Sequence, residues 1–288
     1  MAKKESRTIL VAGATGNQGG AALRHLREKG FTVRCLTRDP TSDKARALVG
    51  RGTEMARGDL DDAASVRRAL DGVYGVYAVQ TFVEKGVEGE LRQGMLLANE
   101  AKRNDVRHFV YSSVGSADRN TGVPHFDSKY KIEEHIRGTG MRYTILRPVF
   151  FMENWLSMRD QIDQGSLRMP LTPETRLQMI AVDDIGGFVA MAFDKPGHWQ
   201  GRTVDLAGDE LSMTELAEVF SRMAGREVRY EQVPWELFEK NVGHELTTMF
   251  RWFQDVGYHV DISDLRREYP LTSFEKWVHQ NWQQRMTA

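Results

Sequence analysis

The chain has 288 residues, 41% of them hydrophobic, so it can bury a full core as one large domain or as two domains that share an interface. Its formal net charge of −1, with both signs interspersed, disfavours direct binding to nucleic acid. Cys35 is the single cysteine, which excludes an intramolecular disulfide and a four-thiolate metal site. We therefore expect a protein of the reducing cytoplasm.

No apolar run approaches the roughly 18 residues that a membrane-spanning helix needs. Residues 1–8 are followed by no long apolar segment before Gly13, so a signal peptide is not expected either. His244, His259 and His279 are scattered without ligand-like spacing. We predict no membrane contact and no metal site.

The first predicted strand, residues 9–12, passes directly into a glycine-spaced turn and then into a helix. In the spacing Gly-x-x-Gly-x-x-Gly, Gly13 allows a tight turn, Gly16 lets the backbone approach a pyrophosphate, and Gly19 lets the helix pack on the strand. Backbone amides at the helix start then face the anion. The pattern predicts a nucleotide cradle, and an ordinary strand-to-helix turn is the alternative.

The second predicted strand, residues 32–37, ends at Arg38. In dinucleotide-binding folds an acidic residue at this position holds the ribose 2′-hydroxyl, whereas an arginine accommodates a 2′-phosphate. Arg38 therefore favours NADP(H) over NAD(H), although NAD(H) is also compatible with the sequence. The alternative is that Arg38 is only a solvated loop charge.

The third predicted strand, residues 53–57, leads into an acidic loop. We assign Asp59 and Leu60 to the adenine pocket. Asp61 and Asp62 are assigned instead to capping the helix at residues 63–70, the commoner use of aspartate at such a place.

The fourth strand and its outgoing loop, residues 75–82, are followed by a long helix over residues 88–102. Outgoing loops in a doubly wound sheet point toward the cofactor crevice, so residues 80–82 are expected to line it. Arg92 lies one turn into the helix, and we interpret it as a surface arginine rather than a phosphate ligand.

A fifth strand at residues 108–114, a helix at 125–136 and a sixth strand at 140–148 follow. With a short helix at residues 45–48, the six strands alternate with five helices. This order predicts an α/β fold, a doubly wound parallel Rossmann sheet with right-handed crossovers. We place the dinucleotide-binding domain at residues 1–150. Residues 151–288 are expected to form a smaller α/β lobe on the substrate side, with some segments returning to the first domain.

An aromatic and methionine-rich patch at residues 150–158 either stacks against a ligand or packs between the lobes. Further on, Asp183 is expected to cap a helix at 182–193, and Ser212 with Glu215 forms a capping box for a helix ending at 223. The remaining predicted elements are strands at residues 203–207 and 228–233 and helices at 235–240, 245–255 and 273–284.

Taken together, several motifs resemble those of the NmrA-like family, a branch of the atypical short-chain dehydrogenases/reductases. The resemblance runs from the first strand to Trp282. The motifs are Gly13-Ala14-Thr15-Gly16-Asn17-Gln18-Gly19-Gly20, Thr37-Arg38-Asp39-Pro40, Gly58-Asp59, His125-Phe126-Asp127-Ser128-Lys129, Arg147-Pro148-x-x-x-Met152-Glu153-Asn154 and Val182-Asp183-Asp184-Ile185-Gly186.

The resemblance implies a Rossmann domain that binds NADP(H) or NAD(H). By motif, Arg38 would contact the 2′-phosphate, Lys129 the nicotinamide ribose, and Ser112 or Ser113 a substrate carbonyl oxygen. The other implied cofactor contacts are Gly13, Ala14, Thr15, Gly16, Asn17 and Gln18 at the phosphates, Asp59 and Leu60 at the adenine, Gln80, Thr81 and Phe82 at the ribose, and Phe151, Met152, Glu153 and Asn154 at the nicotinamide end.

The chain departs from the wider superfamily in its proton donor. Active short-chain dehydrogenases use Tyr-x-x-x-Lys, whose lysine lowers the tyrosine pKa, and here His125 stands in the tyrosine place four residues before Lys129. His125 or an ordered water then protonates the substrate, or the chemistry is lost and the nucleotide is only sensed. The alternative for His125 is a helix cap or a surface residue.

The leading hypothesis is an NADPH-dependent reductase of a small carbonyl, quinone or conjugated acceptor, with Lys129 and His125 as catalytic residues. The alternative is a non-catalytic redox sensor that regulates a protein partner. Expected partners are thus a small-molecule substrate or a regulatory protein, and a homodimer is compatible with the sequence.

Overall fold

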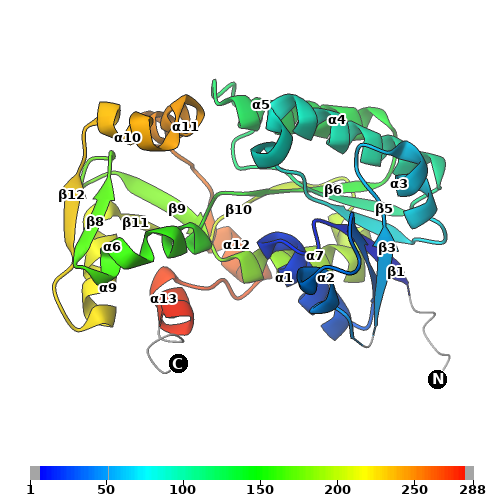
Figure 1. Cartoon of the computed structure of the whole chain (residues 1–288), viewed down its shortest axis with the longest axis horizontal. Coiled ribbons are helices and arrows are strands. Elements are labelled where there is room, and N and C mark those ends of the chain that lie inside the picture. Colours follow the sequence, from blue (N-terminus) through cyan, green and yellow to red (C-terminus); the bar gives the residue numbers. More distant parts are fainter. Residues whose placement is uncertain (1–6, 51, 283–288) are drawn as a thin grey trace. The chain divides into compact units, whose positions relative to one another are not determined.

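The structure is a computed structural model that describes residues 7–50 and 52–282, and Figure 1 gives its element labels. The chain divides into two compact units, and the first main division falls between Arg147 and Pro148. The first unit comprises Met1–Asp118, His125–Arg147 and Ile185–Val204, and the second comprises Arg119–Pro124, Pro148–Asp184 and Asp205–Ala288.

The first unit is built on a seven-stranded sheet in the order β10-β6-β5-β4-β1-β2-β3. The pairings among β1 to β6 are parallel, as the alternation of strands and helices predicts. This confirms the doubly wound Rossmann fold, with β10 as a seventh strand beside β6. The strands are β1 Thr8–Ala12, β2 Thr32–Thr37, β3 Thr53–Arg57, β4 Gly75–Ala78, β5 His108–Ser112, β6 Tyr143–Pro148 and β10 Thr203–Leu206.

Helices cover both faces of this sheet because the central strands are buried on both sides. Leu10 and Ala12 of β1 share a core with apolar residues of α3, α4 and α5, which lie over one face (Figure 1). Helices α1 and α7 cover the other face, and a Cβ at Gly186 of α7 would lie 2.7 Å from the Ala21 backbone of α1. The helices are α1 Asn17–Glu28, α2 Asp43–Arg46, α3 Ala63–Ala69, α4 Phe82–Arg103, α5 Pro124–Gly138, α7 Val182–Asp194 and α8 Pro196–Trp199.

Helix α4 starts earlier than predicted and is interrupted near its beginning. Thr81 caps it by accepting a hydrogen bond from the Val83 N–H (3.2 Å), and the backbone leaves helical geometry at Lys85 and at Gly86, whose φ is +66°. The predicted start at residue 88 is therefore where the regular helix resumes, and residues 82–85 form a separate first turn.

The second unit contains two small sheets, in the orders β11-β9-β7 and β12-β8, together with helices. Its capping box is confirmed: Ser212 and Glu215 exchange hydrogen bonds of 3.1 and 2.7 Å. The elements are β7 Phe150–Phe151, η1 Met152–Met158, α6 Arg159–Asp163, β8 Ser166–Met169, β9 Arg176–Ile180, β11 Asp209–Ser212, α9 Met213–Ala224, β12 Arg229–Gln232, α10 Trp235–Val242, α11 His244–Asp255, α12 Ile262–Glu268 and α13 Phe274–Trp282.

The structure corrects one predicted helix cap and adds four short strands. Helix α7 begins at Val182, so Asp183 lies in its first turn and the prediction that it caps the helix is wrong. Residues 283–284 of the last predicted helix lie outside the described residues. Strands β7, β8, β9 and β11 were not predicted, because two to five residues are too few for a clear alternation of polar and apolar side chains.

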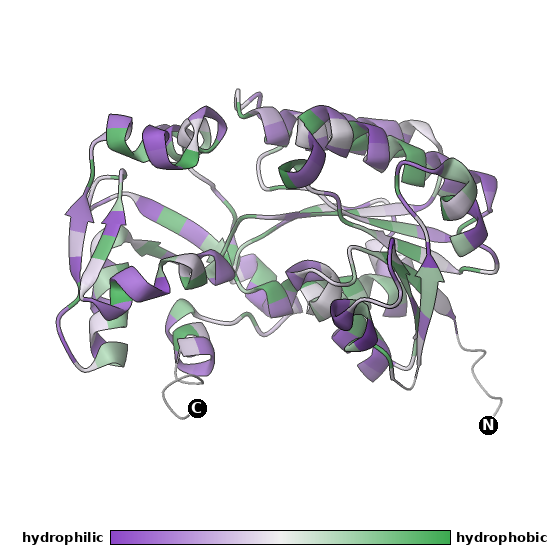
Figure 2. Ribbon diagram, viewed as in Figure 1, coloured by the Kyte–Doolittle hydropathy of each residue, from purple (hydrophilic) through white to green (hydrophobic). Residues whose placement is uncertain are grey.

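Hydropathy follows this architecture: in Figure 2 the strands of the central sheet are largely hydrophobic, and hydrophilic residues run along the covering helices. Within residues 7–50 and 52–282, no helix is long and apolar enough to cross a membrane. In the same part of the chain, no group of three or more histidine, cysteine, aspartate or glutamate side chains could hold a metal ion.

Candidate cofactor site

The turn between β1 and α1 is shaped by glycine. Gly13 has a φ of +71°, a conformation that residues with a side chain rarely adopt, and its carbonyl accepts a hydrogen bond from the Gly16 N–H (2.9 Å). Helix α1 then starts at Asn17 with no side-chain cap. The first amides of a helix lack intrahelical acceptors, so this uncapped end is suited to an anion.

Gly19 explains why the third glycine of the motif is needed. A Cβ at this position would lie 2.1 Å from the Gly13 carbonyl oxygen and 2.8 Å from the Ala14 Cα, both of them backbone atoms. Any side chain at residue 19 would therefore push the turn away from the helix. The turn and the helix start form a tight cradle that only glycine permits.

A cleft of about 330 Å³ opens beside this cradle, at the carboxyl ends of the central strands. Seven of the predicted cofactor residues line it, and they come from four separate loops. These are Gly13, Thr15, Arg38, Asp59, Leu60, Gln80 and Thr81.

The same cleft is lined by residues that the sequence analysis did not assign. Ser42 and Lys44 follow the Arg38 loop closely, and a hydroxyl and an ammonium group next to an arginine are a sequence signal for an anion site. Glu84 and Gln93 come from α4, and no sequence pattern places them here. The other unassigned lining residues are Leu36, Thr37, Asp39, Gly58 and Val79.

The acidic loop after β3 forms one wall of the cleft. Asp59 accepts a hydrogen bond from the Asp61 N–H (3.0 Å), and Asp62 caps α3 as predicted by accepting from Ala64 (3.0 Å). Asp61 is not a cap, which corrects the prediction. Its carboxylate instead lies 2.5 Å from Lys85 Nζ and 3.0 Å from Arg92, and the Lys85 hydrogen bond lowers the Asp61 pKa to about 2.

Lys129 lies in α5, where it is largely buried, and it contacts one of the residues that line the cleft. Its Nζ is 2.9 Å from Glu90 Oε1 and donates a hydrogen bond of 3.2 Å to the carbonyl of Gln80, a cleft residue. Glu90 has no exposed surface and also accepts from Ser128 Oγ (2.6 Å). The lysine is thus fixed by a buried carboxylate with its ammonium group beside the cleft wall.

His125 is buried one turn before Lys129, and its ring is stacked on Phe82 at a centroid distance of 4.4 Å. Since α5 starts at Pro124, His125 is neither a cap nor a surface residue. Desolvation, helped by the charge of Lys129, lowers its pKa to about 4. The imidazole is therefore neutral at pH 7.

The side chains of Gln18 and Ser112 are hydrogen-bonded to each other. Ser112 Oγ donates to Gln18 Oε1 (2.6 Å), and the Tyr77 hydroxyl donates to the same oxygen (3.2 Å). These contacts connect β4 and β5 to α1. Because the Ser112 hydroxyl already donates to Gln18, it is not free to donate to a substrate. Ser113 is the remaining hydroxyl of the predicted pair.

The side-chain amide of Gln80 and the hydroxyl of Ser113 are buried and have no hydrogen-bond partner among the described residues. Gln80 is 5% exposed and lines the cleft. Buried polar groups are normally paired, so an orphaned amide in a cleft wall fits a ligand that supplies the missing donor and acceptor. The residues present therefore fit a dinucleotide.

Residues 151–154, predicted at the nicotinamide end, belong to the second unit. Glu153 accepts hydrogen bonds there from the Val182 N–H (3.1 Å) and from Trp277 Nε1 (3.0 Å), and burial raises its pKa. Met152 is fully buried. Their contact with a cofactor stays a prediction.

The aromatic patch that contains these residues packs within the second unit. Phe150 lies 5.6 Å from Trp155, 6.1 Å from Phe250 and 6.0 Å from Phe253, measured between ring centroids. These rings therefore pack on one another inside a single unit, whereas the packing alternative expected them between the lobes.

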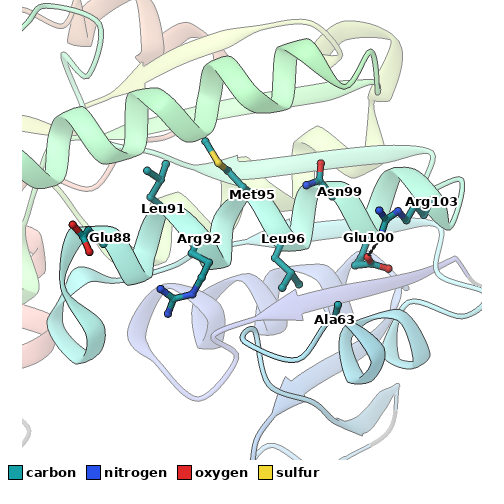
Figure 3. A pocket seen from close by; sticks show the side chains of 9 residues that line it. All are labelled: Ala63, Glu88, Leu91, Arg92, Met95, Leu96, Asn99, Glu100 and Arg103. Atoms are coloured by element: carbon teal, nitrogen blue, oxygen red, sulfur yellow. Dashed lines mark hydrogen bonds and ion pairs between the residues drawn. The ribbon is translucent and has the colours of Figure 1, made fainter.

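A second cavity lies along α4 (Figure 3). Leu91, Met95 and Leu96 are among the residues that line it. Glu100, at one end of it, is held by Arg67 and Arg103 at 2.8 and 2.5 Å. The Glu100 carboxylate thus has its counter-charges within the protein. The Gln80 amide of the cofactor cleft, in contrast, has no partner among the described residues.

The parallel sheet, the glycine turn and the cleft at the strand ends define a Rossmann-type protein. The chain belongs to the NmrA-like family, whose model matches residues 5–278. Among its relatives is the NAD(P)H azoreductase of Xenophilus azovorans, 34% identical over 230 residues, which are 79% of this chain and 78% of that protein.

Two solved structures have the same fold. The NADPH-dependent quinone oxidoreductase of Escherichia coli, in complex with NADPH, has a TM-score of 0.84 and 23% identity, with 95% of this chain and 99% of that chain covered. NmrA, a negative transcriptional regulator in complex with NADP, has a TM-score of 0.81 and 21% identity, with 96% of each chain covered.

Proposed function

We propose that this protein is an NADPH-dependent reductase that delivers hydride to a small carbonyl, quinone or conjugated acceptor. The observation that carries the proposal is the set of groups that line one cleft. Arg38 and Lys44 line it together with Gln80, whose buried side-chain amide has no partner among the described residues and whose carbonyl accepts a hydrogen bond from Lys129. Cationic side chains suit the 2′-phosphate of a dinucleotide, and an unpaired amide beside a lysine suits its ribose.

In this proposal the glycine turn and the start of α1 bind the pyrophosphate, and Asp59 and Leu60 line the adenine pocket. Arg38, with Lys44 nearby, binds the 2′-phosphate, because a guanidinium matches phosphate with two parallel hydrogen bonds. When bound, NADPH supplies the hydride. The Gln80 amide and the Lys129 ammonium orient the ribose next to the nicotinamide.

The acid step differs from that of the wider superfamily. With a pKa of about 4, His125 is not an imidazolium at neutral pH, so it serves as a neutral hydrogen-bond donor and an apolar wall rather than as a strong acid. We therefore favour acceptors whose reduced form is a stabilised anion, such as a quinone, because solvent can protonate that oxygen after hydride transfer. Unconjugated ketones, which need an acid during the transfer, are disfavoured.

The relatives support this choice. The azoreductase and the quinone oxidoreductase are both named for conjugated acceptors and for NAD(P)H or NADPH. These acceptors are small molecules, so we propose a small molecule as the direct partner. The single cysteine suits a reducing compartment, so we also propose that the protein is cytoplasmic.

One observation favours the alternative, a redox sensor that regulates a protein partner. The position four residues before Lys129 holds a buried neutral histidine instead of a tyrosine, and NmrA is a transcriptional regulator that binds NADP. A sensor requires different affinities of the partner for the two cofactor states.

Oxidation of NADPH, followed at 340 nm with a panel of quinones, azo dyes and simple aldehydes, tests the proposal. We expect turnover with quinones or azo dyes and little with aldehydes. Tight NADPH binding without turnover on any acceptor would contradict the reductase and favour the sensor.

A further inference from the structure

The side chain predicted to bind the 2′-phosphate already holds a carboxylate. Arg38 Nη1 lies 3.0 Å from Glu84 Oε2, and Nη2 donates a hydrogen bond of 3.1 Å to Oε1. Both residues line the cofactor cleft. The two-point contact uses the same fork of donors that a phosphate would use.

We infer that Glu84 is a specificity-determining residue: it competes with the 2′-phosphate of NADPH for Arg38 and so narrows the preference for NADPH over NADH. The inference rests on the proposed function. An NADH ribose, which has no phosphate, leaves the Arg38–Glu84 pair intact. An NADPH ribose must displace the carboxylate or share the guanidinium with it.

The position of Glu84 is fixed by the turn that carries it. Residues 82–85 are separated from the rest of α4 by the break at Lys85 and Gly86. Thr81 caps the turn at one end, and at the other Lys85 Nζ is held 2.5 Å from Asp61. Because both ends are anchored, the Glu84 carboxylate stays beside the cleft even after Arg38 turns away.

A carboxylate held there would lie near a phosphate bound by Arg38, and the two like charges repel. The Arg38–Glu84 pair itself is weak, since the two side chains are 61% and 56% exposed. NADPH can therefore displace it, at a loss in affinity of roughly five-fold, which is the upper end for an exposed ion pair. Competition from Glu84 therefore weakens NADPH binding without abolishing it.

The matched variants are Glu84→Gln and Glu88→Gln, each of which removes one exposed negative charge from α4. Glu88 does not line the cofactor cleft. Calorimetric titration with NADP⁺ and NAD⁺, and with 2′,5′-ADP and 5′-AMP as their adenosine halves, measures the preference. We expect Glu84→Gln to tighten NADP⁺ and 2′,5′-ADP about five-fold and to leave NAD⁺ and 5′-AMP unchanged. Glu88→Gln should change none of the four.

An unchanged or weakened NADP⁺ affinity in Glu84→Gln overturns the inference, and so does an equal gain for NAD⁺. In an Arg38→Gln background the gain should shrink, and an undiminished gain overturns the competition for Arg38. Failure of the proposed function has a different result: the unmodified protein would bind neither NADP⁺ nor NAD⁺.

Discussion

Lys129 Nζ lies 2.9 Å from Glu90 Oε1, and the two residues form a largely buried ion pair beside the cofactor cleft. The glutamate has no exposed surface, and the lysine side chain is 12% exposed. Neither charge has access to much water, so each depends on the other. The pair links α4 to α5 and fixes the only lysine that we assign to the ribose.

Glu90→Gln should therefore destabilise the protein, because it leaves the Lys129 ammonium buried without its counter-charge. We expect the free energy of unfolding to fall by about 3 kcal/mol. Urea unfolding followed by circular dichroism measures this change. A double variant, Glu90→Gln with Lys129→Met, removes both charges and should be more stable than Glu90→Gln alone. If the double variant is less stable, the ion pair is not what holds these helices.

The glycine turn provides a sharper comparison. Gly19→Ala places a Cβ 2.1 Å from the Gly13 carbonyl oxygen, so the turn must shift. We expect a loss of about 2 kcal/mol in stability and of most NADPH affinity. Gly20→Ala is the matched control, because its Cβ would lie 3.7 Å from the nearest atom, an ordinary contact. Thermal shift with and without NADPH distinguishes the two, and equal behaviour would contradict the role of Gly19.

Arg38 is tested through cofactor preference rather than through stability. Arg38→Gln removes the guanidinium from the end of β2, and we expect NADPH to bind about ten-fold more weakly while NADH changes little. Fluorescence titration with both cofactors measures the ratio. Arg57→Gln, a second exposed arginine next to this loop, is the control for a general loss of positive charge. Equal losses for NADPH and NADH would remove the role assigned to Arg38.

The sequence was informative where the determinants are local. The turn from β1 to α1 was predicted correctly because glycine spacing, apolar strand residues and helix periodicity all lie within residues 9–26. Asp62 and Ser212 were predicted as helix caps because a cap depends on three or four neighbouring residues.

Two of the failures concern contacts between distant residues. Asp61 has the same local sequence features as Asp62, yet it pairs with Lys85 and Arg92, which lie 24 and 31 positions away. Glu84 reaches Arg38 over 46 positions through a helix break at Gly86, a glycine that the sequence analysis did not single out. Tertiary ion pairs of this kind leave no periodic signal, so the specificity residue emerged only from the structure.

Two buried histidines should make the folded chain less stable in acid. Burial lowers the pKa values of His125 and His108 to about 4, from 6.5 for an exposed histidine. The unfolded chain therefore binds more protons than the folded chain between these values, and folding stability falls as pH decreases from about 6.5 to about 4. Each histidine contributes up to about 3 kcal/mol of this loss.

His125→Asn should reduce the slope of the free energy of unfolding against pH in this window. The part of the slope due to His108 should remain, because that ring keeps its hydrogen bond of 2.8 Å between Nε2 and Thr144 Oγ1. Urea midpoints at pH 7.5, 6.0 and 5.0 measure the slope in both proteins. Comparison with the unmodified chain cancels the opposite effect of Glu153 and Asp184, whose pKa values burial raises. An unchanged slope would mean that His125 is hydrated, and would restore it as a candidate acid at neutral pH.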